Sequence, residues 1–97
     1  MSRRFTIVSY DVTDDKRRDR VAGVLLDYGD RVQYSVFCCQ VSAREMVQLQ
    51  TSLKERLNLE QDRVLLIDAG PVEGQKPQPD VNHIGKPYVT AFRTQIV

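Results

Sequence analysis

The chain has 97 residues, which suffices for one domain with a single modest core. Its 14 lysines and arginines against 13 aspartates and glutamates leave a net charge of +1, so overall charge cannot draw it to a polyanion and any nucleic-acid contact must come from a local patch. No apolar run is long enough to span a bilayer and no signal-peptide pattern opens the sequence, so we expect a cytoplasmic protein without membrane contact.

The chain begins with a strand pattern followed by a helix pattern. Residues 4–10 (RFTIVSY) are rich in β-branched and aromatic side chains, which predicts a strand that runs on into Asp11. Apolar residues at helical spacing come next, and either Thr13 or Asp14 can cap that helix, whose first turn holds acids as its dipole prefers. We expect the helix to end at Gly29.

The stretch 31–41 predicts extended structure with two unlike faces. Its even-numbered residues 32–38 are mostly apolar and are expected to face the core, whereas Phe37 is an aromatic exception on the more polar side. No turn residue lies inside the stretch, so one long strand and two short ones both remain open. The neighbours Cys38 and Cys39 should point to opposite faces, which argues against a disulfide or a zinc site and favours reduced thiols that fill space.

A second helix and another strand pattern follow. Ser42 and Glu45 form a capping box just before apolar residues at helical spacing, and Asn58 is expected to close this helix. Residues 63–69 (RVLLIDA) have the continuous apolar character of a strand buried on both faces. Strands and helices therefore alternate along the chain.

The composition changes after residue 69. Residues 70–87 are rich in glycine and proline and predict a loop, interrupted by a short strand around 81–84, while 88–97 is strand-like again. This order predicts a small α/β sandwich in which one sheet carries both helices on one face. An uncovered second face and a spare terminal strand together favour a homodimer.

Asp11 is the first candidate for chemistry, because open α/β sheets place functional groups at the carboxyl ends of their strands. One carboxylate holds a magnesium ion poorly. A two-fold axis close to Asp11 would bring a second copy from the other protomer, and two facing carboxylates suit Mg²⁺ or Mn²⁺, which can polarise a phosphoryl oxygen or supply a hydroxide. The alternative is that Asp11 or a neighbouring acid only caps the helix.

Four basic residues, Lys16, Arg17, Arg18 and Arg20, occupy the first helical turns. Helical spacing puts Arg17 in line with the apolar stripe, so its stem should lie on the core edge, and puts Arg18 and Arg20 on either side, where they could reach phosphates. The alternative is a solvated charged face. Arg31 opens the next strand at the same end of the molecule if the predicted fold is right.

Tyr10 and Phe37 are the candidates for stacking on bases of single-stranded nucleic acid, since one lies near a strand end and the other on a polar strand face. Packing in a dimer explains both residues equally well. The sequence leaves both roles open.

Two stretches carry a family resemblance. VSYDVTDDKRRDRVA (8–22) and LxDYGDRVQYSVF (25–37) resemble the CRISPR-associated Cas two family, the small partner of the Cas one integrase. The resemblance implies an α+β class, ferredoxin-like βαββαβ sandwich over residues 1–80, with 31–41 divided into two strands. It also implies a homodimer in which residues 81–97 supply an additional C-terminal strand that is exchanged between the protomers.

The resemblance further implies a site. It places the family's metal-binding carboxylate, with Mg²⁺ or Mn²⁺ as cofactor, at Asp11 of each protomer, facing across the dimer cleft. It places other positions important for activity at Tyr10, Arg18, Arg20, Arg31 and Phe37.

Family resemblance leaves two functions open. In the first, the dimer is a metal-dependent phosphodiesterase acting on RNA or double-stranded DNA. In the second, it is a scaffold that bridges integrase dimers in spacer acquisition and holds nucleic acid by phosphate contacts. We favour the adaptation role, with nuclease activity as a biochemical property; the alternative is a toxin-like, mRNA-cleaving endoribonuclease outside CRISPR adaptation.

Overall fold

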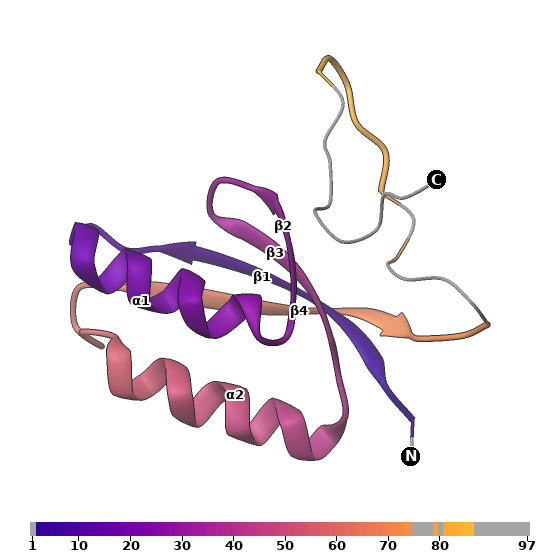
Figure 1. Ribbon diagram of the computed structural model, residues 1–97, viewed down its shortest axis with the longest axis horizontal. Coiled ribbons are helices and arrows are strands. Elements are labelled where there is room, and N and C mark those ends of the chain that lie inside the picture. The colour runs from indigo at the N-terminus through magenta and orange to yellow at the C-terminus, as the bar shows by residue number, and fades with distance from the viewer. Residues whose placement is uncertain (1, 75–78, 80, 87–97) are drawn as a thin grey trace.

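The computed structural model describes residues 2–74, 79 and 81–86, so the predicted terminal strand over 88–97 lies outside the described residues. Six elements follow one another in the order βαββαβ (Figure 1). They are β1 (Arg4–Asp11), α1 (Asp15–Leu26), β2 (Gly29–Gln33), β3 (Val36–Val41), α2 (Ala43–Arg56) and β4 (Arg63–Pro71).

The four strands form one antiparallel sheet in the spatial order β2-β3-β1-β4. Helices α1 and α2 lie side by side across one face of this sheet (Figure 1). The predicted ferredoxin-like α+β sandwich is therefore confirmed for the described residues, and the stretch 31–41 divides into two short strands. Within the described chain, neither helix is long and apolar enough to cross a membrane.

Local signals fix where the helices begin. Asp14 caps α1 and its carboxylate accepts a hydrogen bond from the Arg17 backbone N–H at 2.9 Å. The predicted capping box starts α2, with the Ser42 N–H donating to Glu45 Oε1 at 2.9 Å and the Glu45 N–H donating to Ser42 Oγ at 3.2 Å. These bonds satisfy backbone donors that have no partner inside a helix.

The helices end slightly before the predicted residues. Helix α1 stops at Leu26, and Gly29 instead opens β2, where a Cβ atom would lie 2.1 Å from the Cys38 carbonyl oxygen. Only glycine fits this close approach between β2 and β3. Helix α2 ends at Arg56, two residues before Asn58.

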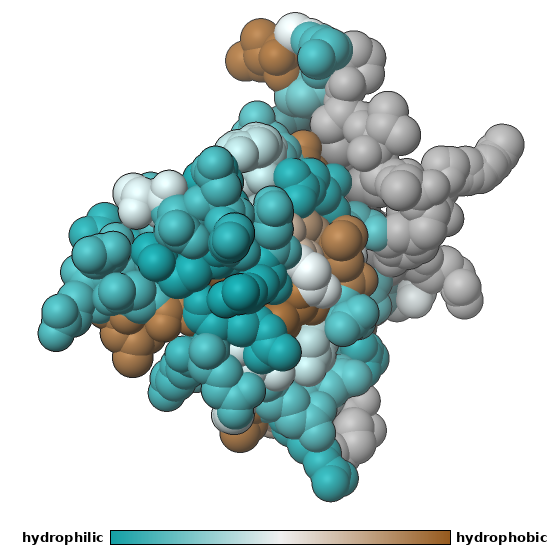
Figure 2. Space-filling view, turned by 60° about the vertical axis from the view of Figure 1, so that its left-hand side comes forward, coloured by the Kyte–Doolittle hydropathy of each residue, from teal (hydrophilic) through white to brown (hydrophobic). Residues whose placement is uncertain are grey.

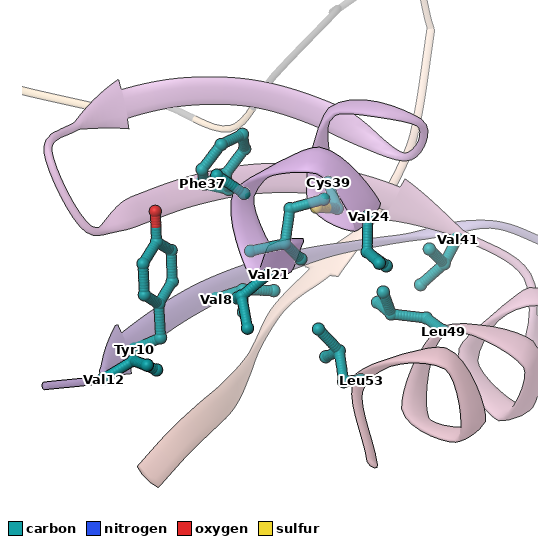
Figure 3. Close-up of a cluster of buried hydrophobic side chains, with 12 residues drawn as sticks. Val8, Tyr10, Val12, Val21, Val24, Phe37, Cys39, Val41, Leu49 and Leu53 are labelled. Atoms are coloured by element: carbon teal, nitrogen blue, oxygen red, sulfur yellow. The ribbon is translucent and has the colours of Figure 1, made fainter. Parts of the chain in front are cut away.

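The core lies between the sheet and the two helices (Figure 3). Phe37 is fully buried there, so its predicted place on a polar face is wrong. The register pairs Val8 with Phe37 and Ile7 with Cys38, which puts Phe37 on the helix-covered face and Cys38 on the other. Because both faces of β3 are largely apolar, alternation in sequence could not tell which of them meets the helices.

The two cysteines behave as predicted. Both are free and buried, and consecutive positions in β3 direct them to opposite faces of the sheet. Burial raises the pKa of the Cys39 thiol to about 12. This thiol therefore stays protonated at neutral pH and acts as a small apolar side chain.

The sheet face directed away from the helices is called the open face below. The register assigns to it alternate residues of three strands: Phe5, Ile7, Ser9, Asp11, Val36, Cys38, Gln40, Arg63, Leu65 and Ile67.

The prediction that residues 63–69 are buried on both faces is wrong. Within the described chain β4 is one of the two edge strands and pairs only with β1. Leu65 and Ile67 on the open face are 50% and 49% exposed, and Leu66 on the helix side is 37% exposed. The short strand predicted around 81–84 is also absent, because these residues have no regular structure.

Candidate functional site

Asp11 ends β1 on the open face, opposite Arg63 of β4. Its side chain is exposed and makes no hydrogen bond or ion pair with the rest of the described chain. Asp14 caps the following helix, so the capping alternative applies to Asp14 and not to Asp11. The Asp11 carboxylate is therefore available to an external ligand.

The turn between β2 and β3 is fastened beside this strand end. The Tyr34 carbonyl oxygen accepts hydrogen bonds from the Tyr10 hydroxyl at 3.3 Å and from Arg31 Nη1 at 3.1 Å. The Ser35 carbonyl accepts a third bond, from the Tyr10 backbone N–H at 3.0 Å. Two of the predicted site residues thus position the turn against Tyr10, the residue before Asp11.

Two arginines are held at the same end of the molecule. Arg18 Nη1 donates to the Val12 carbonyl at 2.9 Å, pairs with Asp15, and lies 5.8 Å from the centroid of the Tyr34 ring. Arg31 lies 5.2 Å from the centroid of the Phe37 ring. Contacts of this kind orient a guanidinium group while leaving further N–H donors for a phosphate.

Tyr10 and Phe37 cannot stack on bases in this conformation, because Tyr10 is 4% exposed and Phe37 is fully buried. Their ring centroids lie 6.2 Å apart inside the core. Burial is the main cause that raises the pKa of Tyr10, against the lowering effect of Arg31. Its hydroxyl therefore stays protonated at neutral pH and serves as a hydrogen-bond donor.

Arg20 and Arg17, two further basic residues of α1, differ in their surroundings. Arg20 is exposed and has no polar partner in the described chain; two residues from Arg18, it lies about 160° around the helix from it. Arg17 instead forms a two-bond ion pair with Asp62, at 2.8 and 3.0 Å. The solvated-face alternative thus fits Arg20 better than it fits Arg17 or Arg18.

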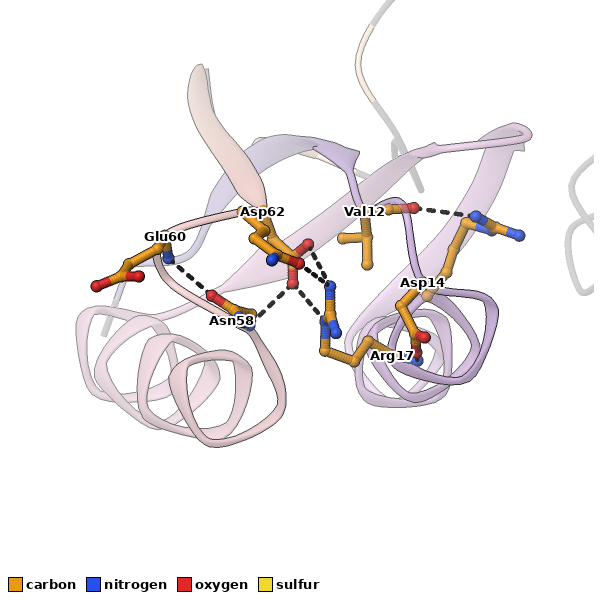
Figure 4. Close-up of polar contacts among 8 residues, drawn as sticks. Val12, Asp14, Arg17, Asn58, Glu60 and Asp62 are labelled. Atoms are coloured by element: carbon orange, nitrogen blue, oxygen red, sulfur yellow. Dashed lines mark hydrogen bonds and ion pairs between the residues drawn. The ribbon is translucent and has the colours of Figure 1, made fainter.

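The Asp62 side chain has no solvent exposure and also accepts a bond from the Asn58 backbone N–H at 2.8 Å (Figure 4). Hydrogen bonding to Arg17 is the first cause that lowers the pKa of Asp62, and the Asn58 bond acts in the same direction. This pair ties the start of α1 to the loop before β4. Asp62 and Tyr34 were both missed by the sequence analysis, because their partners lie far away in the chain.

Figure 2 brings forward the end of the molecule where α1 begins. Hydrophilic side chains predominate on this face and the hydrophobic ones form separate groups. Within the described residues no three His, Cys, Asp or Glu side chains lie together as a metal site. A divalent cation at Asp11 would therefore need ligands from outside the described part of one chain.

Comparison with known proteins identifies a family to which this chain is similar. The family model of CRISPR associated protein Cas2 matches residues 4–73. The chain belongs to the Cas2 family. This agrees with the resemblance seen in the sequence, and the matched residues include all six elements in full.

Curated relatives in the Cas2 family match over most of their length. The CRISPR-associated endoribonuclease Cas2 of Geobacter sulfurreducens is 32% identical over 94% of this chain and 94% of its own. The CRISPR-associated endonuclease Cas2 2 of Thermus thermophilus is 38% identical over 87% of this chain and 97% of its own.

Solved structures agree with these sequence matches. Streptococcus pyogenes Cas2, in a crystal structure at pH 6.5, has a TM-score of 0.68 and 31% identity, covering 84% of this chain and 99% of that one. A hypothetical protein, TT1823, from Thermus thermophilus has a TM-score of 0.69 and 36% identity, covering 90% and 99%.

Proposed function

We propose that this protein is a metal-dependent endonuclease that works as a homodimer in CRISPR spacer acquisition. The observation that carries the proposal is the Asp11 carboxylate, which is exposed and unpaired within the described chain at a strand end. Its two chain neighbours are tied to arginines, since Val12 accepts a bond from Arg18, and Tyr10 donates to the same Tyr34 carbonyl as Arg31. The names of the curated relatives as endoribonucleases and endonucleases support the nuclease part.

The open face supports a homodimer. Leu65 and Ile67 are half-exposed on it, although large apolar side chains gain free energy when they are removed from water. A second copy of the chain placed on this face covers both residues. Because Asp11 lies on the same face, a two-fold axis nearby brings the two Asp11 carboxylates together.

The Asp11 site fits a hard divalent cation only as half of a shared site. A carboxylate oxygen is the ligand that Mg²⁺ or Mn²⁺ prefers, and one described chain contributes this one group. A bound cation would polarise a phosphoryl oxygen or supply a hydroxide for attack on a phosphodiester. Arg18 and Arg31 donate to phosphates of RNA or double-stranded DNA, while Tyr10 holds the turn that positions Arg31.

Cleavage by the purified protein tests the catalytic part. Single-stranded RNA and duplex DNA are incubated with wild type and Asp11→Asn, with Mg²⁺ and with EDTA. We expect Asp11→Asn to lose more than about 100-fold in rate, because even the outer-shell partners of a bound metal are worth up to about that factor. Asp27→Asn, an exposed acid at the other end of α1, is the matched control and should cleave normally.

Spacer acquisition tests the biological part. A host strain carrying Asp11→Asn is compared with wild type and with a clean deletion. If the deletion loses acquisition and Asp11→Asn keeps it, the protein acts as a scaffold that bridges the Cas one integrase. Cleavage is then dispensable for acquisition. If both strains lose acquisition while the variant still folds and dimerises, acquisition requires the pair of Asp11 carboxylates. Normal acquisition in the deletion would reject the adaptation role and favour the toxin-like mRNA-cleaving alternative.

A further inference from the structure

Tyr34 differs from the other aromatic residues that the structure describes. Its side chain is 68% exposed, whereas Phe5, Tyr10 and Phe37 are 3%, 4% and 0% exposed and Tyr28 is half-buried against the core. An aromatic ring gives up the favourable burial of its surface when it stays in water. The fold therefore does not account for an aromatic residue at this position.

The backbone beneath the Tyr34 ring is fixed. Its carbonyl oxygen accepts two side-chain hydrogen bonds, from Tyr10 at 3.3 Å and from Arg31 at 3.1 Å, and the next carbonyl accepts a bond from the Tyr10 N–H at 3.0 Å. Three hydrogen bonds therefore fix two consecutive residues of this short turn. They hold the backbone that carries the ring in place before a ligand arrives, which lowers the entropy that binding must overcome.

One arginine lies against the ring and a second is bonded to the backbone beneath it. The Arg18 guanidinium lies 5.8 Å from its centroid, and Arg31 is bonded to the Tyr34 backbone itself. An exposed aromatic ring with arginines nearby is the combination that binds single-stranded nucleic acid, where bases stack on rings and cations follow the phosphates. The stacking role considered for Tyr10 and Phe37 thus has a better candidate in Tyr34.

We propose that the Tyr34 ring is a stacking surface for an unpaired base of the bound nucleic acid, with Arg18 and Arg31 holding the adjoining phosphates. This inference rests on the proposed function, because it names one way in which that site holds its substrate. It predicts a preference for strands with accessible bases over fully paired duplex at this position.

Fluorescence offers a direct test, because the chain contains no tryptophan. Tyr34→Trp places a single indole at the turn. The control, Val47→Trp, places one on α2, away from the turn. The two positions are similarly exposed, at 68% for Tyr34 and 66% for Val47. Both proteins are titrated with an oligothymidylate and with a hairpin duplex. We expect the oligothymidylate to quench Tyr34→Trp and to leave Val47→Trp unchanged.

Affinity measurements on Tyr34→Ala and Tyr34→Phe complete the test. Loss of one stacked base should weaken oligothymidylate binding by about 5-fold to about 150-fold in Tyr34→Ala, and Tyr34→Phe should restore it. The salt dependence of binding should stay as in wild type, because no cation is removed. A merely structural role of the ring would instead lower the melting temperature of Tyr34→Ala.

The failures of the two proposals are distinguishable. Equal oligothymidylate affinity of wild type and Tyr34→Ala, with no quenching in Tyr34→Trp, overturns the stacking inference alone. A wild-type protein that binds neither oligonucleotide overturns both the inference and the proposed function. If Tyr34→Ala keeps its affinity for nucleic acid but no longer binds the integrase partner, the ring contacts protein and not a base. That result also overturns the inference.

Discussion

The helix-covered face of the sheet and the open face are built from alternate residues of the same strands, yet the described chain covers them very differently. Val8 and Phe37, on the helix side, are fully buried, whereas Leu65 and Ile67, on the open face, are about half exposed. Apolar side chains on the first face stabilise this chain's own core. On the second face the described chain buries Phe5 and Cys38, but Leu65 and Ile67 remain available to something that it does not supply.

The largest effect is expected from the helix-covered face. Phe37→Ala removes a fully buried ring from the core and should lower the free energy of unfolding by about 3–5 kcal/mol, much of the stability of a domain of this size. Urea unfolding followed by circular dichroism measures this loss. Tyr34→Ala is the matched control, since a surface substitution changes stability by about 0.5 kcal/mol or less. Equal losses in the two variants would contradict the assignment of Phe37 to the core.

The next effect concerns the ion pair that fastens α1 on the covered face. The Arg17 bond lowers the pKa of Asp62, so the carboxylate is more easily charged in the folded state than in the unfolded one. Its contribution is fully present above the unfolded value of about 4 and is lost as the pH falls through the lower folded value. Asp62→Asn should therefore be less stable than wild type at pH 7 and lose less stability between pH 5 and pH 3.

Asp68 supplies the control for Asp62. Arg4 donates two bonds of 2.8 Å to the Asp68 carboxylate, but these side chains are 51% and 59% exposed, against 22% and 0% for Arg17 and Asp62. Solvent screening makes an exposed pair worth little. At each pH the urea midpoint is measured for wild type and both variants. The midpoint of Asp62→Asn should differ from that of wild type by more than the midpoint of Asp68→Asn does. The reverse order would show that burial is not what distinguishes the two pairs.

A smaller loss is expected at the start of α2, the second helix on the covered face. Ser42→Ala removes the side-chain acceptor of the capping box and should destabilise the protein by about 1 kcal/mol. Ser42→Asp keeps an acceptor at the same place and should recover most of the loss. If both variants unfold at the wild-type urea midpoint, the cap contributes nothing measurable to this helix.

The sequence permitted prediction of the features that depend on neighbouring residues. The element order and both helix starts follow from short patterns, such as the Ser42–Glu45 box, whose partners are three residues apart. The contacts at the candidate site are different. Tyr10 reaches the Tyr34 carbonyl across 24 residues and Arg17 reaches Asp62 across 45, and no local pattern encodes such pairings.

Burial was harder to predict than secondary structure. The continuous apolar run of β4 has the same sequence character whether helices or another chain cover it, so its exposure could not be deduced. Phe37 was misplaced for a related reason, because β3 is apolar on both sides. Asp11 could be chosen as a candidate because its position at a strand end depends only on the strand boundary.

The open face should give the smallest effect on the fold and a clear effect on assembly. Ile67→Gln replaces a half-exposed apolar side chain, so the free energy of unfolding of the dilute monomer should change by about 0.5 kcal/mol or less. In sedimentation velocity over a concentration series, wild type should associate and Ile67→Gln should remain monomeric at concentrations where wild type is dimeric. Val47→Gln, a similarly exposed change on α2, should leave association intact. A dimer that tolerates Ile67→Gln must use a surface other than the open face. Such a dimer would not bring the two Asp11 carboxylates together.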